Sequence, residues 1–88
     1  MAEWINEPIT VEVQPRPGGA PRPVAFVWRG TRYAVSAWGR EDLKTYGDDT
    51  FYCYMIQTEG PETWQICQQV EQGAWMVSRR WPRGPVAV

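Results

Sequence analysis

The six residues from Trp28 to Tyr33 place the strongest constraint on how this chain of 88 residues folds. Two short runs rich in β-forming residues flank an Arg-Gly pair, and Gly takes the positive φ that a type I′ turn needs. We therefore predict a β-hairpin over about residues 23–38, and its register pairs Trp28 with Thr31, Phe26 with Tyr33 and Val24 with Val35. In that register all six side chains share one face, as a half-buried ribbon requires.

Further strands are predicted on either side of this hairpin. Residues 9–13 alternate apolar and polar side chains, and residues 51–58 are rich in Tyr, Phe, Ile and Thr without a breaker. A turn at 59–62 leads into a strand over 63–70, and this pairing places Tyr54 opposite Ile66, Ile56 opposite Trp64, and Cys53 opposite Cys67 on the other face. A last turn at Gln72-Gly73 pairs Val70 with Trp75, Gln68 with Val77 and Trp64 with Trp81, which leaves Arg79 opposite Ile66.

Four segments are predicted to interrupt the strands. Pro8 prevents the first strand from extending backwards, and residues 14–23, with four Pro and two Gly, form a long mobile loop that excludes helix and ladder. That loop is alternatively a Pro-rich ligand for a groove-type domain, because polyproline geometry is preformed. The acidic stretch Arg40–Thr50 is predicted to be a loop with a short helical turn, and residues 82–88 a frayed tail.

These elements describe an all-β protein of one domain, residues 1–88. A small meander buries its apolar face by curling, so we predict an antiparallel meander of about five to six strands that forms a partly open, SH3-like barrel. Aromatic residues make up 14% of the chain, with six Trp, and large rings bury much area in a small core.

The charges of the chain sum to −1, but they are unevenly distributed. Residues 1–40 hold five Arg against three Glu, residues 41–78 hold Lys44 against seven acids, and residues 79–88 hold three Arg. We interpret this as a solvated surface whose basic ends attract an acidic centre; a local basic patch that meets phosphate is the alternative. No signal peptide or membrane span is evident, and we predict a cytoplasmic protein that does not contact a membrane.

Catalysis and metal binding have little support in the residue types. The chain has no His, the usual general base near neutral pH, and nothing at metal spacing completes a zinc site around Cys53 and Cys67. We therefore predict no enzyme activity, no metal, no cofactor and no small-molecule substrate. The opposed cysteines are able to form a disulfide, but in a reducing cytoplasm we expect two free thiols.

Several apolar residues fall out of phase with the predicted core. Strand alternation directs Trp38, Phe51, Met55 and Met76 away from it, which predicts a second apolar surface. Tyr46, Leu43, the N-terminal strand or the Pro-rich loop covers that surface, or it contacts another protein or a second copy of the chain. The alternative function is single-stranded nucleic-acid binding, through an Arg and aromatic surface made of Arg29, Arg32, Arg79, Arg80 and Arg83 with Trp38 and Trp81 as stacking platforms.

Several of these residues also form a family pattern. The motifs are Glu7-Pro8-Ile9, a Pro-rich gap, Phe-x-Trp-Arg-Gly-x-x-Tyr-x-Val from Phe26 to Val35, Tyr54 to Thr58, and Gly73 to Trp75. Over most of residues 5–81 the chain resembles a small bacterial family of uncharacterised domains, domain of unknown function 6504. Members of that family are companions of Y-family translesion DNA polymerases, so the resemblance implies a DNA-repair context without defining an activity. The Arg40–Thr50 stretch departs from the pattern, which has a more regular helical segment there.

We therefore predict a non-catalytic interaction module. Its partner is another protein or a second copy, and nucleic acid is the alternative ligand.

Overall fold

The computed structural model describes residues 2–82, and the elements in this range are strands. They are β1 (Glu3–Pro8), β2 (Thr10–Gln14), β3 (Arg22–Trp28), β4 (Thr31–Tyr46), β5 (Asp49–Thr58), β6 (Thr63–Gln69) and β7 (Trp75–Trp81). They form one antiparallel sheet in the order β1-β7-β6-β5-β4-β3-β2, which confirms the all-β meander. The strands number seven rather than the five to six predicted.

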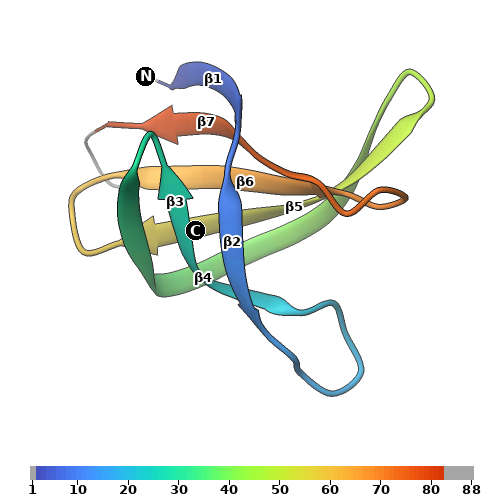
Figure 1. Ribbon diagram of the computed structural model, residues 1–88, viewed down its shortest axis with the longest axis horizontal. Helices are drawn as coiled ribbons and strands as arrows, with labels where there is room; N and C mark the ends of the chain where they lie inside the picture. The colour runs from blue at the N-terminus through green and yellow to red at the C-terminus, as the bar shows by residue number, and fades with distance from the viewer. Residues whose placement is uncertain (1, 83–88) are drawn as a thin grey trace.

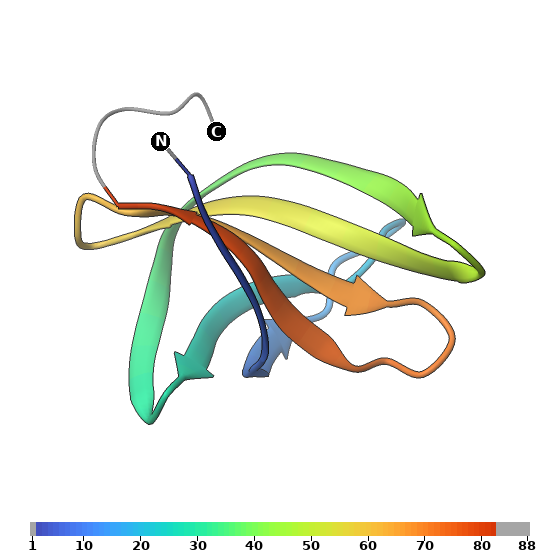
Figure 2. The ribbon, with the colours of Figure 1, turned by 90° about the horizontal axis from the view of Figure 1, so that it is seen from above.

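The sheet is curled into an open half-barrel because its two edge strands are consecutive in the chain. β1 pairs with β7 at one edge and β2 pairs with β3 at the other, and only Ile9 separates them. The Ile9 N–H donates a hydrogen bond to the Trp75 carbonyl, which holds this junction against the start of β7. Figure 1 shows β2 and β3 lying across β5 and β6, and Figure 2 shows β2 and β3 facing β4 and β5 across the interior.

The β3–β4 hairpin has the predicted register at its tip, and its pairs end at Ala25 and Ala34, short of the predicted pair of Val24 with Val35. Trp28 pairs with Thr31 and Phe26 pairs with Tyr33. Arg29 and Gly30 both have positive φ, at 50° and 79°, as the two central residues of a type I′ turn require. Phe26 and Trp28 are buried, so the hairpin contributes its aromatic face to the core.

The β5–β6 pairing is also confirmed, residue for residue. Tyr54 pairs with Ile66, Ile56 pairs with Trp64, and Cys53 pairs with Cys67. This ladder has no register shift, so simple alternation along both strands gives the correct faces.

The predicted β6–β7 register is wrong. Gln68 pairs with Trp75 and Ile66 with Val77, because the connection extends over residues 70–74 instead of turning at Gln72-Gly73. A bulge beside Gln65 then shifts the register again, so that Gln65 pairs with Arg79. The true register gives Ile66 an apolar partner and removes the polar mismatch that the prediction left on the core face.

Strands replace two predicted interruptions. The acidic stretch after Arg40 continues β4 as far as Tyr46, where a turn containing Gly47 at φ 61° leads into β5, so the predicted helical turn is wrong. The chain before Pro8 is also a strand, β1, which pairs with β7 and not with β3. Pro8 is tolerated there because it ends an edge strand.

The Pro-rich loop is shorter and better anchored than predicted. Its ends belong to β2 and β3, where Gln14 pairs with Arg22 and Val13 with Pro23, so the expectation of no ladder over 14–23 is wrong. Tyr54 Oη–H donates to the Pro21 carbonyl at 2.8 Å, and an ion pair joins Arg16 to Glu41. Among the residues of the predicted frayed tail only Pro82 is described, and it follows β7; residues 83–88 lie outside the described range.

The core lies on the concave side of the curled sheet. Trp64 is fully buried, and its ring packs against Phe26, Trp28 and Tyr33 at centroid distances of 4.9 to 5.6 Å. Its Nε1–H donates to Thr58 Oγ1, so the polar group of the indole is satisfied inside the core.

Candidate functional site

The outer face of β5, β6 and β7 carries a second apolar surface. Because side chains alternate along a strand, Phe51, Met55 and Met76 lie opposite the core residues of the same strands. Cys53 pairs with Cys67, and Cys67 pairs with Met76, so these side chains form a row across the sheet. The predicted placement of Phe51, Met55 and Met76 on this face agrees with the pairing, although Met55 is only 8% exposed. We call this surface the outer face.

A disulfide at the centre of the outer face joins β5 to β6. Cys53 and Cys67 are bonded, their Cα atoms are 4.1 Å apart, and both side chains are buried. The expectation of two free thiols is therefore wrong, since the direct cross-strand pairing brings the two sulfur atoms into bonding contact. The expectation rested on a cytoplasmic location, which itself stays a prediction.

An open groove of about 360 Å³ runs across the outer face. Exposed aromatic side chains form part of its rim: Trp4 is 64% exposed and Tyr46 is 58% exposed. The Tyr46 ring packs edge-on against Phe51, 5.9 Å between centroids. The groove is lined by Trp4, Asn6, Tyr46, Asp49, Phe51, Cys67, Met76 and Ser78.

The residues and segments that were predicted to cover the outer face do not close it. Tyr46 reaches the groove but leaves it open, whereas the predicted N-terminal strand, residues 9–13, packs on the core through Ile9 and Val11. Leu43 pairs with Tyr52, which packs on the core, so Leu43 lies on the concave side. The Pro-rich loop is also anchored there, through Tyr54.

Trp38 does not belong to the outer face, so its predicted orientation is wrong. It pairs with Ile56 and packs against the core, and its Nε1–H donates to the Pro23 carbonyl at 2.6 Å. Register shifts occur on both sides of it, between Val35 and Ala37 and between Trp38 and Glu41. A bulge reverses the alternation of the residues that follow, which moves Trp38 to the other face.

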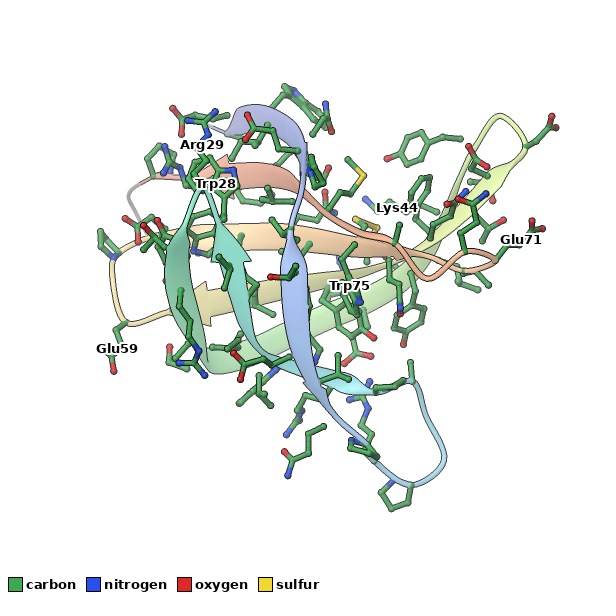
Figure 3. All side chains as sticks on the ribbon, in the orientation of Figure 1. Trp28, Arg29, Lys44, Glu59, Glu71 and Trp75 are labelled. Carbon is green, nitrogen blue, oxygen red and sulfur yellow. A yellow bond between two sulfur atoms is a disulfide. The ribbon has the colours of Figure 1, made fainter. Side chains whose placement is uncertain are left out.

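Three of the predicted nucleic-acid-binding arginines are paired with glutamates of the N-terminal segment. Arg29 bonds Glu7 through two nitrogens at 2.6 and 3.0 Å, Arg32 bonds Glu12 in the same manner, and Arg80 bonds Glu3. The partners of these basic residues therefore come from the first strands and not from the acidic centre of the chain. Figure 3 shows Trp28 and Arg29 at the hairpin tip beside β1.

The pairs with Arg29 and Arg32 lower the pKa of their carboxylates. The pKa of Glu7 falls below its usual value mainly because Arg29 donates hydrogen bonds to it, with a further one from Trp28 Nε1–H. The pKa of Glu12 falls because of Arg32. Paired in this way, Arg29 and Arg32 present less positive charge to a phosphate.

Arg79 has a different environment. Its guanidinium lies 4.6 Å from the Trp4 ring centre and 4.9 Å from that of Trp81, and its Nε–H donates to Gln65 Oε1. Trp81, predicted as a stacking platform, thus stacks with a cation of its own strand. Arg83, the fifth predicted cation, lies outside the described residues.

Sequence reasoning missed Trp4 and Asn6 as parts of the groove, since the segment before Pro8 was not expected to pair with β7. The available signal is the pair of β-forming residues Trp4 and Ile5 shortly before Pro8. Asn6 has φ 52°, and a register shift lies between Trp4 and Glu7, so the local alternation is broken in a way that sequence patterns do not show.

Within residues 2–82 there is no cluster of three His, Cys, Asp or Glu side chains able to hold a metal ion. None of the described elements is a helix long and apolar enough to cross a membrane. Comparisons with family models, with curated proteins and with solved structures find no match for this chain.

Proposed function

We propose that this protein is a non-catalytic binding module that takes a protein partner on its outer face. The observation that carries the proposal is the open groove, lined by Phe51 and Met76 and rimmed by the exposed rings of Trp4 and Tyr46. Apolar surface with aromatic and Met side chains is typical of the centre of protein interfaces.

Rigid support for the groove favours recognition of a partner without large rearrangement. Its floor belongs to the paired strands β5, β6 and β7, and the disulfide between Cys53 and Cys67 links β5 to β6. A surface that is ordered before binding loses little conformational entropy when a partner docks.

The partner class follows from the family resemblance, which we carry here as part of the proposal. The half-barrel is of the SH3-like type, and the partner is a bacterial Y-family translesion DNA polymerase. In this arrangement the module supplies a contact surface and the polymerase supplies the chemistry.

Biolayer interferometry with the immobilised protein and a purified bacterial Y-family polymerase tests this function. We expect concentration-dependent binding that Met76→Asp reduces at least about tenfold, because a carboxylate buried at an interface without a partner is costly. Val13→Asp is the matched control, since Val13 is 44% exposed on β2 outside the groove. Absence of wild-type binding, or equal loss in both variants, contradicts the proposal.

Single-stranded nucleic acid is a second candidate, favoured by one observation. Arg79 between Trp4 and Trp81 combines a cation with two indole rings, of which Trp4 is highly exposed. Bases stack on such rings while Arg contacts phosphate. Titration with a short single-stranded oligonucleotide at low salt tests this: quenching of Trp fluorescence that Trp4→Ala removes supports it, and an unchanged spectrum rejects it.

A further inference from the structure

The second half of β4 has one unpaired edge. From Glu41 to Tyr46 it pairs with β5 on one side. On its other side the pairs with β3 end at Ala34, and no described strand continues them. Figure 1 shows this end of the β4–β5 hairpin projecting beyond β2 and β3. An unpaired edge of this length presents a row of backbone donors and acceptors to another strand.

The hairpin turn determines which residues present these groups. Tyr46 pairs with Asp49 next to the turn, and Thr45 pairs with Thr50. The Thr50 carbonyl accepts a hydrogen bond from the Val70 N–H on the β6 side, at 2.9 Å, so the backbone of Thr50 faces away from β4. Backbone direction alternates along a strand, and Thr45, Leu43 and Glu41 therefore direct N–H and C=O groups to the free edge.

The side chains of this edge, of which Leu43, Thr45 and Tyr46 are exposed, are self-complementary when the segment is reversed. We propose that two copies of the protein pair through these edges, antiparallel, with Leu43 of one copy opposite Leu43 of the other. This register places Glu41 of one copy opposite Thr45 of the other, so that their edge-facing backbone N–H and C=O groups form hydrogen bonds. It also sets Asp42 opposite Lys44 twice, once on each side of the two-fold axis. Opposite charges in directly facing positions stabilise a strand pair, and like charges destabilise it.

Charge excludes the adjacent registers in which the same backbone groups face each other. Moving the pairing by two residues one way places Asp42 opposite Asp42 and Arg40 opposite Lys44. Moving it the other way places Lys44 opposite Lys44. Both alternatives bring like charges together, so the register centred on Leu43 is favoured.

Pairing in this register also covers an exposed apolar side chain. Leu43 is 64% exposed in the single chain, although it lies in the middle of a strand. In the dimer, Leu43 of one protomer contacts Leu43 of the other protomer across the two-fold axis. Asp42 and Lys44 pair with the outer-face residues Cys53 and Phe51, so their side chains lie on the outer face. Pairing through these residues places the two outer faces on the same side of one continuous sheet.

Charge reversal tests this register directly. In sedimentation-velocity experiments over a range of concentrations we expect the wild type to dimerise. Asp42→Lys and Lys44→Asp each place like charges opposite one another in a homodimer, so we expect each variant to shift toward monomer by at least about tenfold in dissociation constant. An equimolar mixture of the two variants restores the opposite charges and should associate again, as should the double variant Asp42→Lys/Lys44→Asp.

Controls separate this contact from loss of folding and from the outer-face proposal. Glu59→Lys changes the net charge as Asp42→Lys does, at a turn far from Lys44 (Figure 3), and should dimerise like the wild type. Met76→Asp should also dimerise, even though it weakens partner binding. A monomeric wild type, or single variants that dimerise as well as the wild type, overturns the proposal; so does a mixture of the two single variants that stays monomeric.

Discussion

The two faces of strands β5–β7 are both apolar, but within residues 2–82 only the concave one lies under other strands of the sheet. On the concave side Ile56, Ile66 and Trp64 have no exposed surface, because β2 and β3 lie over them (Figure 2). On the outer face Phe51 and Met76 are partly exposed, and rings at the rim leave an open groove between them. The same alternation of apolar residues therefore gives a core on one side and a partly exposed apolar surface on the other.

The difference shows that a side chain can have a low exposed fraction without lying under a second layer of strands. Met55 and Cys67 lie on the outer face and are nevertheless at most 8% exposed. Inner side chains such as Phe26 and Trp64 instead contact rings from other parts of the curled sheet. Substitutions on the inner face should thus change stability, and those on the outer face should change binding.

Removing a large side chain from each face tests this division and should give the largest effect. Trp64→Ala empties the centre of the core and should lower the free energy of unfolding by about 3–5 kcal/mol. Met76→Ala, at a partly exposed outer position, should cost about 1 kcal/mol or less. Thermal unfolding followed by circular dichroism measures both, since each kcal/mol shifts the melting temperature by about 4–8 °C in a domain of this size. Equal shifts for the two variants would remove the distinction between core and contact surface.

Reducing the disulfide should give the next effect, because this bond links β5 to β6 across the outer face. The disulfide closes a loop with a sequence separation of 14 residues, and a loop of that length contributes about 3 kcal/mol. We expect reductant to lower the unfolding temperature of the wild type and to leave Cys53→Ala/Cys67→Ala unchanged. Intact-mass measurement with and without reductant shows the gain of two hydrogen atoms; no gain means that the thiols are free.

The parts of the fold that were predictable from sequence have regular alternation and short turns. The β3–β4 hairpin has its Gly at the required position, and β5–β6 pairs without a bulge, so counting residues gives the right partners. The β6–β7 pairing failed because a five-residue connection and a bulge shift the register twice. Neither feature has a marker in the residue types.

The candidate site was predictable to the same extent. Phe51 and Met76 follow from alternation, but Trp38 is placed on the core by register shifts on both sides. The acidic end of β4 was not predicted to be a strand because it projects beyond the core, and its exposed polar residues lack the apolar alternation of a half-buried strand. The residues of this projecting end of β4 can be assigned to a strand only when the sheet itself is known.

Alkaline titration should give the smallest effect, and it concerns the inner face alone. Burial, with a smaller contribution from the nearby carboxylate of Glu41, raises the pKa of Tyr54 from 10.0 to about 12. Above pH 10 the unfolded chain releases this proton while the folded chain retains it, so the free energy of unfolding falls as pH rises from 10 to 12. Below pH 10 this contribution is fully present.

Urea unfolding at a series of pH values measures that decline. Tyr54→Phe loses the hydrogen bond to Pro21, which lowers stability at neutral pH, but it should make the decline between pH 10 and 12 shallower. Tyr46→Phe, at the exposed rim of the outer face, is the matched control and should keep the wild-type slope. If both variants keep that slope, Tyr54 is not held neutral by the core, and the inner face is more hydrated than its coverage by β2 and β3 implies.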